Sequence, residues 1–390
     1  MACGGFAMRQ PCRGESRTGP RRLLRRRPGK YFPLFQGMIS TVFDPQGLGP
    51  WEPPSMMEAQ LRERIKEFSR FAPRGSLRVH RNTSEFMEIR PDDVIELEGR
   101  FFLVRGEESE GRFGLDGEPK FWVKRAVDLE DGAPHILKLV FHETFIMKLG
   151  EQRIRCYRSP QKESRILEKV KGHPHFMQGV TLYDEAGNPV RVIERIRGAS
   201  FYEFINGLDL DHRRYFLEVF PEIFEKVLAS FEAIATLHRM GEIHGDVRND
   251  HILIERQTGL YRWIDFDYAY EWTEQPFGVD LFGLGNILLF AVGKGFHTID
   301  MLGMGAGGVP AQTAEPLTAD DFSLFFPNRL MNLRKIFPYI PDSLNHVLMY
   351  FSSGAEVFYE EAEEMIADLH HCKELCRREV FHGTQGAGGR

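Results

Sequence analysis

The stretch "IHGDVRNDHILI", Ile243 to Ile254, places two His, two Asp, an Arg and an Asn directly before and within a run of strand-forming residues. A long amphipathic helix is predicted before it, over Phe220 to Met240, and the strand patterns "HILIE" and "LYRWIDFDYA" follow it. A loop that leads into a short hairpin can lie near the far end of that hairpin. We therefore expect Asp246, in the loop, and Asp265, at the end of the hairpin, to lie close together.

Two carboxylates held at one place suit phosphoryl transfer. One carboxylate can orient the attacking hydroxyl while another holds Mg²⁺ on the phosphates, and cations neutralise the developing charge. Asp265 follows the apolar pair Trp263-Ile264, which favours a rigid position. An Asp after an apolar strand is more often a turn or capping residue, so this interpretation depends on the rest of the chain.

The remaining pattern predicts an α+β fold. From Asp93 to Val140, short runs rich in β-branched and aromatic residues alternate with Gly and Asp turns, which predicts an antiparallel meander. A helix is predicted from Ser159, as its N-cap, to Pro174, and a hairpin is predicted about residues 186–188. After Gly198, helical patterns dominate.

The composition is that of an ordinary globular protein. The chain has 390 residues, 42% hydrophobic and 27% charged, with a net charge of −6, which gives no support for a nucleic-acid partner. No apolar run reaches the roughly eighteen residues of a membrane helix, so no integral membrane segment is expected. The five Cys are sparse and odd in number, which fits a reducing compartment and predicts a cytoplasmic location.

Most of the chain, from about Asp93 to about Cys376, resembles the protein kinase superfamily. The "HGD" at 244–246 looks like the catalytic-loop motif of that family, so the resemblance implies that Asp246 is the catalytic Asp. It also implies that Arg248 takes the place where Ser/Thr kinases carry a Lys against the γ-phosphate. The "DFD" beginning at Asp265 stands where the family has Asp-Phe-Gly, which makes Asp265 the expected metal ligand.

The resemblance continues in the strand-rich half. "ILKLV" is similar to the third strand of the family, which implies that Lys138 binds the α- and β-phosphates of ATP. "KESRIL" is similar to the helix that follows, which implies that Glu163 forms an ion pair with that Lys. Because the segment between these two residues is long, Lys148 is a weaker rival for the ATP lysine.

Two further segments resemble family motifs. "RVIERIRGASFYEFI" resembles the hinge, which puts Ile193 near the gatekeeper place and implies that Glu194 to Ile196 line the adenine edge through backbone groups. "DLFGLGNIL" resembles a buried helix, which implies that Asp280 anchors the catalytic loop and that Gly285 packs tightly.

The sequence also departs from the family. Arg105 to Pro119 has glycines without the G-x-G-x-x-G spacing, and the "HGD" lacks the Arg that reads a phosphorylated activation loop. About a dozen residues separate Asp267 from Asp280, and no Ala-Pro-Glu follows. In these respects the chain resembles aminoglycoside phosphotransferases and lipopolysaccharide-core sugar kinases more than regulated protein kinases.

His251 occupies the position, five residues after Asp246, where protein kinases carry a metal-binding Asn. Three interpretations are open: His251 binds Mg²⁺ or Mn²⁺, it braces Asp246 or Asp265, or the site is degenerate. The lipopolysaccharide-core sugar kinases also show a His here, by resemblance. Asp267 is expected either to share a metal or to serve as an N-cap or solvent-facing residue.

The resemblance implies a two-lobed protein-kinase-like α+β fold. An antiparallel-sheet N-lobe is expected over 93–197 and a helical C-lobe over 198–380. A helical extension over 56–92 is expected to precede them, because Leu61, Ile65 and Phe68 have helical spacing. The basic, Pro- and Gly-rich leader 1–55 and the tail 381–390 are expected to be disordered.

The implied function is transfer of the γ-phosphate of ATP·Mg to a hydroxyl group. The first choice of acceptor is a protein Ser or Thr, because a cation stands two residues after Asp246. The second choice is a small molecule or lipopolysaccharide sugar, because of the short segment after Asp267. The third alternative is a pseudokinase that binds nucleotide or a partner without turnover. Expected partners are therefore ATP and a protein or small-molecule acceptor, with no nucleic acid.

Overall fold

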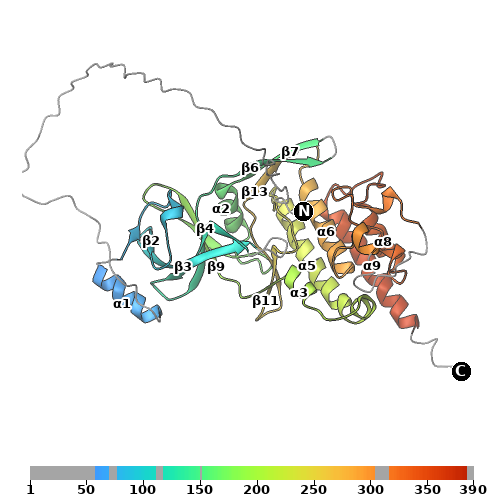
Figure 1. Ribbon diagram of the computed structural model, residues 1–390, viewed down its shortest axis with the longest axis horizontal. Helices are drawn as coiled ribbons and strands as arrows, with labels where there is room; N and C mark the ends of the chain where they lie inside the picture. The colour runs from blue at the N-terminus through green and yellow to red at the C-terminus, as the bar shows by residue number, and fades with distance from the viewer. Residues whose placement is uncertain (1–57, 70–76, 111–116, 150–151, 304–315, 384–390) are drawn as a thin grey trace, which may run out of the picture. The chain divides into compact units, whose positions relative to one another are not determined.

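Four successive strands form the antiparallel meander that the sequence predicts. They are β2 (Val94–Leu97), β3 (Arg100–Glu110), β4 (Glu118–Asp128) and β5 (Pro134–Lys138). The computed structural model describes residues 58–69, 77–110, 117–149, 152–303 and 316–383 (Figure 1). The predicted leader 1–55 lies outside the described residues.

The meander is part of a seven-stranded sheet with the order β1-β2-β3-β4-β5-β9-β8. The short β1 (Val79–His80) runs parallel to β2 at one edge. The predicted hairpin, β8 (Gly179–Tyr183) and β9 (Pro189–Glu194), adds the other two strands. Because β9 pairs with β5, Lys138 lies opposite Arg191 in the register.

Two helices lie in the strand-rich half of the chain, one before the strands of this sheet and one between β5 and β8. In α1 (Glu58–Phe68), Leu61 and Ile65 are buried, as their spacing predicts. In α2 (Pro160–Lys169), the side chain of Ser159 accepts a hydrogen bond from the backbone of Lys162 and so caps the N-terminus as predicted. Helix α2 lies against β8 and β9, which brings its buried face to the sheet.

Helices dominate after residue 200, with short helical turns between them. The helices are α3 (Phe201–Asn206), α4 (His212–Arg214), α5 (Phe220–Arg239), α6 (Gly278–Val292), α7 (Ile299–Gly303), α8 (Asp342–Met349) and α9 (Ala362–Gly383). The turns are η2 (Tyr215–Val219), η4 (Ala319–Asp321) and η5 (Leu333–Lys335), and a further turn, η1 (Phe86–Glu88), precedes β2 in the strand-rich half. Helix α9 continues to Gly383, so the tail expected to be disordered from residue 381 begins within a helix.

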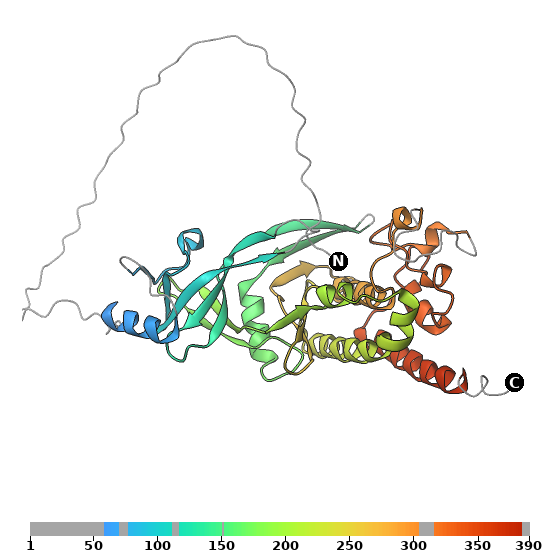
Figure 2. The ribbon, with the colours of Figure 1, turned by 60° about the horizontal axis from the view of Figure 1, so that its bottom comes forward.

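The buried helices form the core of this half. Helix α5 lies beside both α6 and α9, as Figure 2 shows for the yellow-green and red helices. Every residue of α6 is buried, in agreement with its almost entirely apolar sequence. Gly285 of α6 faces the ring of Phe351 so closely that a Cβ at this position would lie 2.6 Å from it. Within the described ranges, none of the helices combines the length and apolar character that a membrane span requires.

The structure contains two further small sheets, of which the sequence predicts only the hairpin formed by "HILIE" and the start of "LYRWIDFDYA". One contains β10 (Gly198–Ser200), β11 (Ile252–Glu255) and β12 (Tyr261–Trp263), and the other contains β6 (Thr144–Leu149), β7 (Gln152–Arg158) and β13 (Tyr268–Glu271). The expected strand "LYRWIDFDYA" is wrong as one element. It breaks at Asp265, whose φ of 65° is incompatible with a strand, and its second part pairs with β7 instead of continuing the hairpin.

Candidate active site

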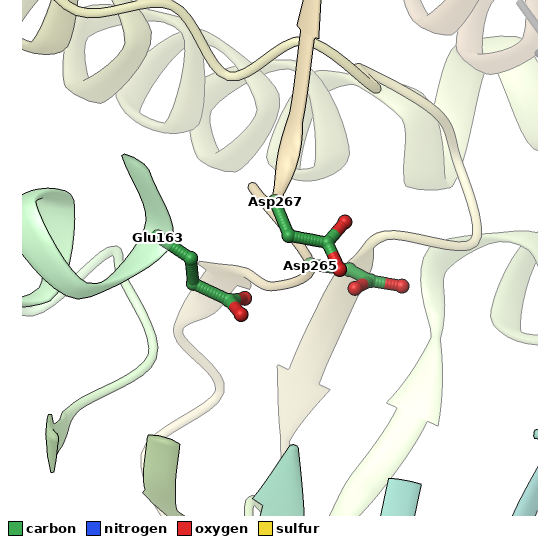
Figure 3. A group of neighbouring side chains, drawn as sticks. All are labelled: Glu163, Asp265 and Asp267. Atoms are coloured by element: carbon green, nitrogen blue, oxygen red, sulfur yellow. The ribbon is translucent and has the colours of Figure 1, made fainter. Parts of the chain in front are cut away.

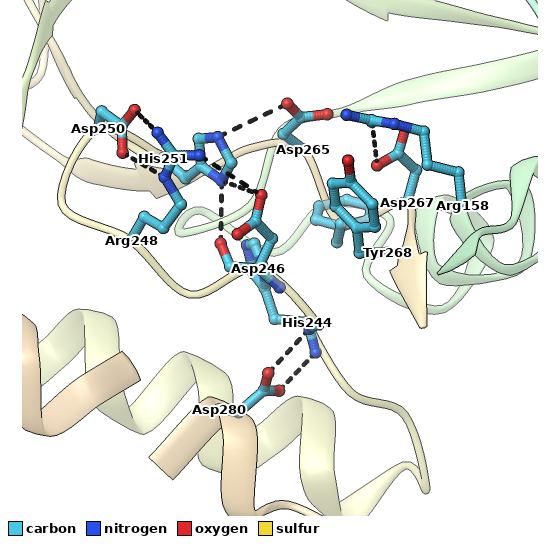
Figure 4. Close-up of polar contacts among 12 residues, drawn as sticks. Arg158, His244, Asp246, Arg248, Asp250, His251, Asp265, Asp267, Tyr268 and Asp280 are labelled. Atoms are coloured by element: carbon cyan, nitrogen blue, oxygen red, sulfur yellow. Dashed lines mark hydrogen bonds and ion pairs between the residues drawn. The ribbon is translucent and has the colours of Figure 1, made fainter. Parts of the chain in front are cut away.

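The loop quoted at the outset is tied to the start of α6. Both carboxylate oxygens of Asp280 accept backbone hydrogen bonds, from His244 at 2.6 Å and from Gly245 at 2.8 Å (Figure 4). The ring of His238, at the end of α5, lies 3.1 Å from the same carboxylate. Burial alone would raise the pKa of Asp280, but these hydrogen bonds and His238 lower it, so the anchor stays ionised.

A second anchor comes from α2. The buried ammonium of Lys162 donates to the backbone oxygens of His244, Phe266 and Tyr268 at 2.6 to 2.9 Å. Burial lowers the pKa of Lys162 to about 8. At Gly245, where φ is 86°, the backbone approaches the Tyr268 oxygen too closely for any Cβ. One helix therefore fixes the loop and the segment after Asp265 together.

Lys138 lies at the centre of a buried group of carboxylates. Its ammonium is 2.7 Å from Glu163 of α2, 2.5 Å from Asp265 and 3.1 Å from Asp267. Glu163 comes from α2, and Asp265 and Asp267 come from the segment between β12 and β13, as Figure 3 shows; one oxygen of each lies within 4.8 Å of the others. Arg191 of β9 donates to the other oxygen of Glu163 at 3.1 Å. The rival Lys148 lies exposed on β6, opposite Arg153 of the hairpin.

The sequence leaves three roles open for Asp267: sharing a metal, capping a helix, or facing solvent. The last two are wrong, because Asp267 is buried and caps no helix. Both its oxygens accept hydrogen bonds from Arg158 of β7 at 2.8 Å. The guanidinium of Arg158 also lies 4.0 Å from the ring centroid of Tyr268 and donates to Glu143. The β6–β7 hairpin therefore holds the segment after Asp265 through both a strand pairing and a buried ion pair.

Replacing Arg158 with methionine is expected to destabilise the protein by roughly 3 kcal/mol, because it leaves part of the charge of Asp267 buried without a partner. The measurement is urea-induced unfolding. The matched control is Arg155→Met on the same strand, whose pair with Glu271 is more than half exposed. That control should change the free energy of unfolding by about 0.5 kcal/mol or less. Equal losses in the two variants would contradict the buried role of Arg158.

Asp246 is almost completely buried, with 3% of its surface exposed. Its Oδ1 atom is buried without a hydrogen-bond partner among the described residues. Its Oδ2 atom lies 3.5 Å from His251 and 3.9 Å from Arg248. Arg248 is itself held by the two oxygens of Asp250, through Nε at 2.8 Å and through Nη2. Burial raises the pKa of Asp246, with Asp265 contributing in the same direction and His251 and Arg248 opposing it.

The ring of His251 bridges the two central carboxylates. Its Nδ1 lies 2.9 Å from the backbone oxygen of Asp246, and because a carbonyl can only accept, Nδ1 carries the hydrogen. In the neutral ring, Nε2 then presents its lone pair, and it lies 3.6 Å from Oδ2 of Asp265. In metal-binding His residues the other ring nitrogen commonly donates to a carbonyl or carboxylate, which fixes the tautomer and leaves the second nitrogen for the metal, and the Nδ1 bond of His251 has this form. The hydrogen bond from Nδ1 to the Asp246 carbonyl also holds the loop in place, which agrees with the second interpretation, that His251 braces the loop.

Asp265 joins these contacts in a strained backbone position. Its φ of 65° is uncommon for a residue other than Gly, although Asp tolerates it better than most. Burial raises its pKa, but Lys120, Lys138 and other cations outweigh burial and hold the pKa well below the usual range of an Asp. Asp265 is therefore an anion in the folded protein.

The predicted hinge residues lie at the far end of β9. Glu194 is the last residue of that strand, and its backbone donates to the oxygen of Gln178 at 2.9 Å. Ile196 follows in the connection to β10 and packs, half-buried, against the main hydrophobic cluster. Ile193 is buried in the same cluster.

Sequence reasoning missed four cations of the site. They are Lys120, Arg158, Lys162 and Arg191. Each lies within an ordinary strand or helix pattern, where Lys and Arg are usually solvated. A signal exists only for Lys162, because it directly precedes Glu163 on a predicted helix whose face packs inward. The other three depend on strand register.

No family model matches the chain. Among curated proteins, the chain is similar to the "Putative ribosomal protein S6 kinase alpha-2" of Caenorhabditis elegans, with 29% identity over 162 residues. The match covers 40% of this chain and 18% of that protein, so the chain spans less than two thirds of the length of the relative. This partial match supports a protein-kinase-like relationship and nothing finer.

Proposed function

We propose that the chain is an ATP-dependent phosphotransferase with the two-lobed arrangement of the protein kinases, in which ATP lies between the seven-stranded sheet and the helix-rich half. The observation that carries this proposal is the meeting of Lys138, Glu163 and Asp265 beside Asp246. Two of these residues come from β5 and α2, and two come from loops that Asp280 and Lys162 fix. Preorganised charges of this kind are the main requirement of phosphoryl transfer.

Within this proposal, each residue has a role that its contacts allow. Asp246 orients the acceptor hydroxyl, because its Oδ1 is buried with no partner among the described residues and is therefore available to accept a hydrogen bond. Lys138 binds the phosphates of ATP while Glu163 keeps its ammonium in place. Arg248, fixed by Asp250 beside Asp246, stabilises the transferred charge. Glu194 and Ile196 contact the adenine through backbone groups.

The residues around Asp265 fit a divalent cation such as Mg²⁺ or Mn²⁺. Glu163 and Asp267 are each bound by Lys138 and by a buried arginine, whereas Asp265 is bound by two lysines, Lys138 and Lys120. Asp265 and the Nε2 of His251 are therefore the donors that we assign to the metal. A bound divalent cation supplies charge neutralisation at the phosphates.

Substitution of His251 separates the roles of ligand and brace. His251→Ala is expected to lower kcat/KM by roughly 10- to 100-fold at limiting Mg²⁺, because a donor and its supporting hydrogen bond are both lost. His251→Asn should retain much of the activity, because its side-chain oxygen is a suitable ligand for Mg²⁺. The measurement is kcat/KM as a function of Mg²⁺ and Mn²⁺ concentration. Full activity in both variants would reject the ligand role.

The acceptor that we propose first is a protein Ser or Thr, because a cation stands two residues after Asp246. A small hydroxyl compound or lipopolysaccharide sugar is the second candidate, and one observation favours it. The strand after Asp265, β13, is paired with β7, and only residues 272–277 separate it from α6. Little chain is therefore present there to form a platform for a peptide.

The experiment that tests the function is an acceptor assay with purified protein and γ-labelled ATP·Mg. Label on a generic protein acceptor supports the first candidate, and label only on sugars or other small alcohols supports the second. Nucleotide binding without any transfer or hydrolysis would instead support a pseudokinase and contradict the proposed activity.

A further inference from the structure

A second lysine reaches the same carboxylate as Lys138. Lys120 lies on β4, whereas Lys138 lies on the neighbouring strand β5. The ammonium of Lys120 is 3.2 Å from Oδ2 of Asp265, and that of Lys138 is 2.5 Å from Oδ1. The two side chains thus bind opposite oxygens of one carboxylate, and the side chain of Lys120 is 15% exposed.

The oxygen that Lys120 contacts is the one that the proposed metal site needs. Oδ2 of Asp265 also faces Nε2 of His251, at 3.6 Å. Lys138 can stay in place when a cation binds there, because Glu163 and Asp267 also hold its ammonium. An ammonium at 3.2 Å from Oδ2 repels a divalent cation bound to that oxygen. The two cations therefore compete for Asp265.

We infer that Lys120 is a second phosphate-binding lysine, which neutralises Asp265 before nucleotide binds and moves to the phosphate oxygens when ATP·Mg enters. This inference rests on the proposed function. A Lys side chain is suited to such a move, because its ammonium is a point charge on a flexible stem and binds phosphate without a fixed geometry. The ligand class is a nucleoside di- or triphosphate with a divalent cation.

The test compares nucleotide affinities by titration calorimetry in wild type, Lys120→Met, Lys120→Arg and the control Lys148→Met. Lys120→Met is expected to weaken ATP·Mg binding by roughly 10- to 100-fold, the effect of one lost charge-assisted hydrogen bond. AMP, which has no β- or γ-phosphate, should bind within about twofold of wild type. Lys120→Arg should recover part of the ATP affinity, and Lys148→Met, an exposed change on β6, should match wild type.

The same variant that binds ATP·Mg more weakly is expected to bind a free metal ion more tightly. Without nucleotide, Lys120→Met should bind Mn²⁺ more tightly than wild type in an electron paramagnetic resonance titration, because the competing ammonium is gone. Circular dichroism checks that the variant is folded, and Lys120→Gln replaces it if it is not.

The outcomes distinguish this inference from the proposed function. Normal ATP affinity in folded Lys120→Met, or an equal loss for AMP and ATP, would overturn the role of Lys120 while wild-type ATP binding still supports the proposed function. Higher turnover in Lys120→Met would also overturn it, because the ammonium would then only block the site. Failure of wild-type protein to bind ATP would overturn both.

Discussion

Asp246→Asn is expected to abolish most phosphate transfer while leaving nucleotide affinity almost unchanged. Loss of a positioned general base lowers rates by roughly 10²- to 10⁴-fold, and an asparagine at this position cannot accept the proton of the acceptor hydroxyl. ATP affinity should persist, because Lys138 and Asp265 remain. The measurement is kcat for label transfer together with calorimetric ATP affinity. The surface change Asp209→Asn, at an exposed position between α3 and α4, is the matched control.

The pH profile of the wild-type protein gives an independent check on Asp246. The ionised carboxylate is the working form, so kcat/KM should fall as pH decreases through its pKa. Because burial raises that pKa, the fall should begin at a higher pH than for an ordinary Asp. Unchanged kcat in Asp246→Asn would contradict the assignment whatever the profile of the wild type.

Asp265→Asn is expected to remove Mg²⁺-dependent ATP binding and to lower kcat by roughly 10²- to 10³-fold, the usual cost of losing one preorganised charge in a reaction of this kind. An Asn keeps the shape of the side chain but loses the charge that attracts the metal. Lys138 keeps Glu163 and Asp267 as partners, so the strand and helix around it should stay in place.

The measurement is ATP affinity with Mg²⁺ and with EDTA. In wild type Mg²⁺ should strengthen binding, and in Asp265→Asn the two affinities should converge. Asp209→Asn should retain the wild-type difference. A variant that still responds to Mg²⁺ as the wild type does would show that another residue holds the metal.

The elements of the fold follow from local patterns where the sequence is regular. The cap of α2 at Ser159, the meander and the apolar helix α6 all agree with their sequences, because each depends on neighbours a few residues away. The meeting of Asp246, Asp265 and Asp280 could also be expected, because their order along the chain resembles a known family. The mixed α+β character of the chain is confirmed.

The parts of the structure that the sequence does not predict depend on contacts between segments far apart in the chain. The β6–β7 hairpin was missed because its sequence looks like a long connection between Lys138 and α2. The strand that completes its sheet, β13, lies more than a hundred residues further along the chain. Asp267 looked like a surface or metal residue because Arg158, its partner, belongs to that hairpin. Arg191 is unpredictable for a similar reason, since the pairing of β9 with β5 places it at Glu163.

The central claim is that this chain transfers phosphate from ATP by means of Asp246 and Asp265. The most direct measurement is the rate of ADP formation from ATP·Mg, with and without acceptor, by wild type, Asp246→Asn and Asp265→Asn in parallel. We predict that the wild type forms ADP only when Mg²⁺ is present, and that both variants lose this turnover. Equal turnover in all three proteins, or ATP binding by the wild type with no turnover at all, would contradict the account.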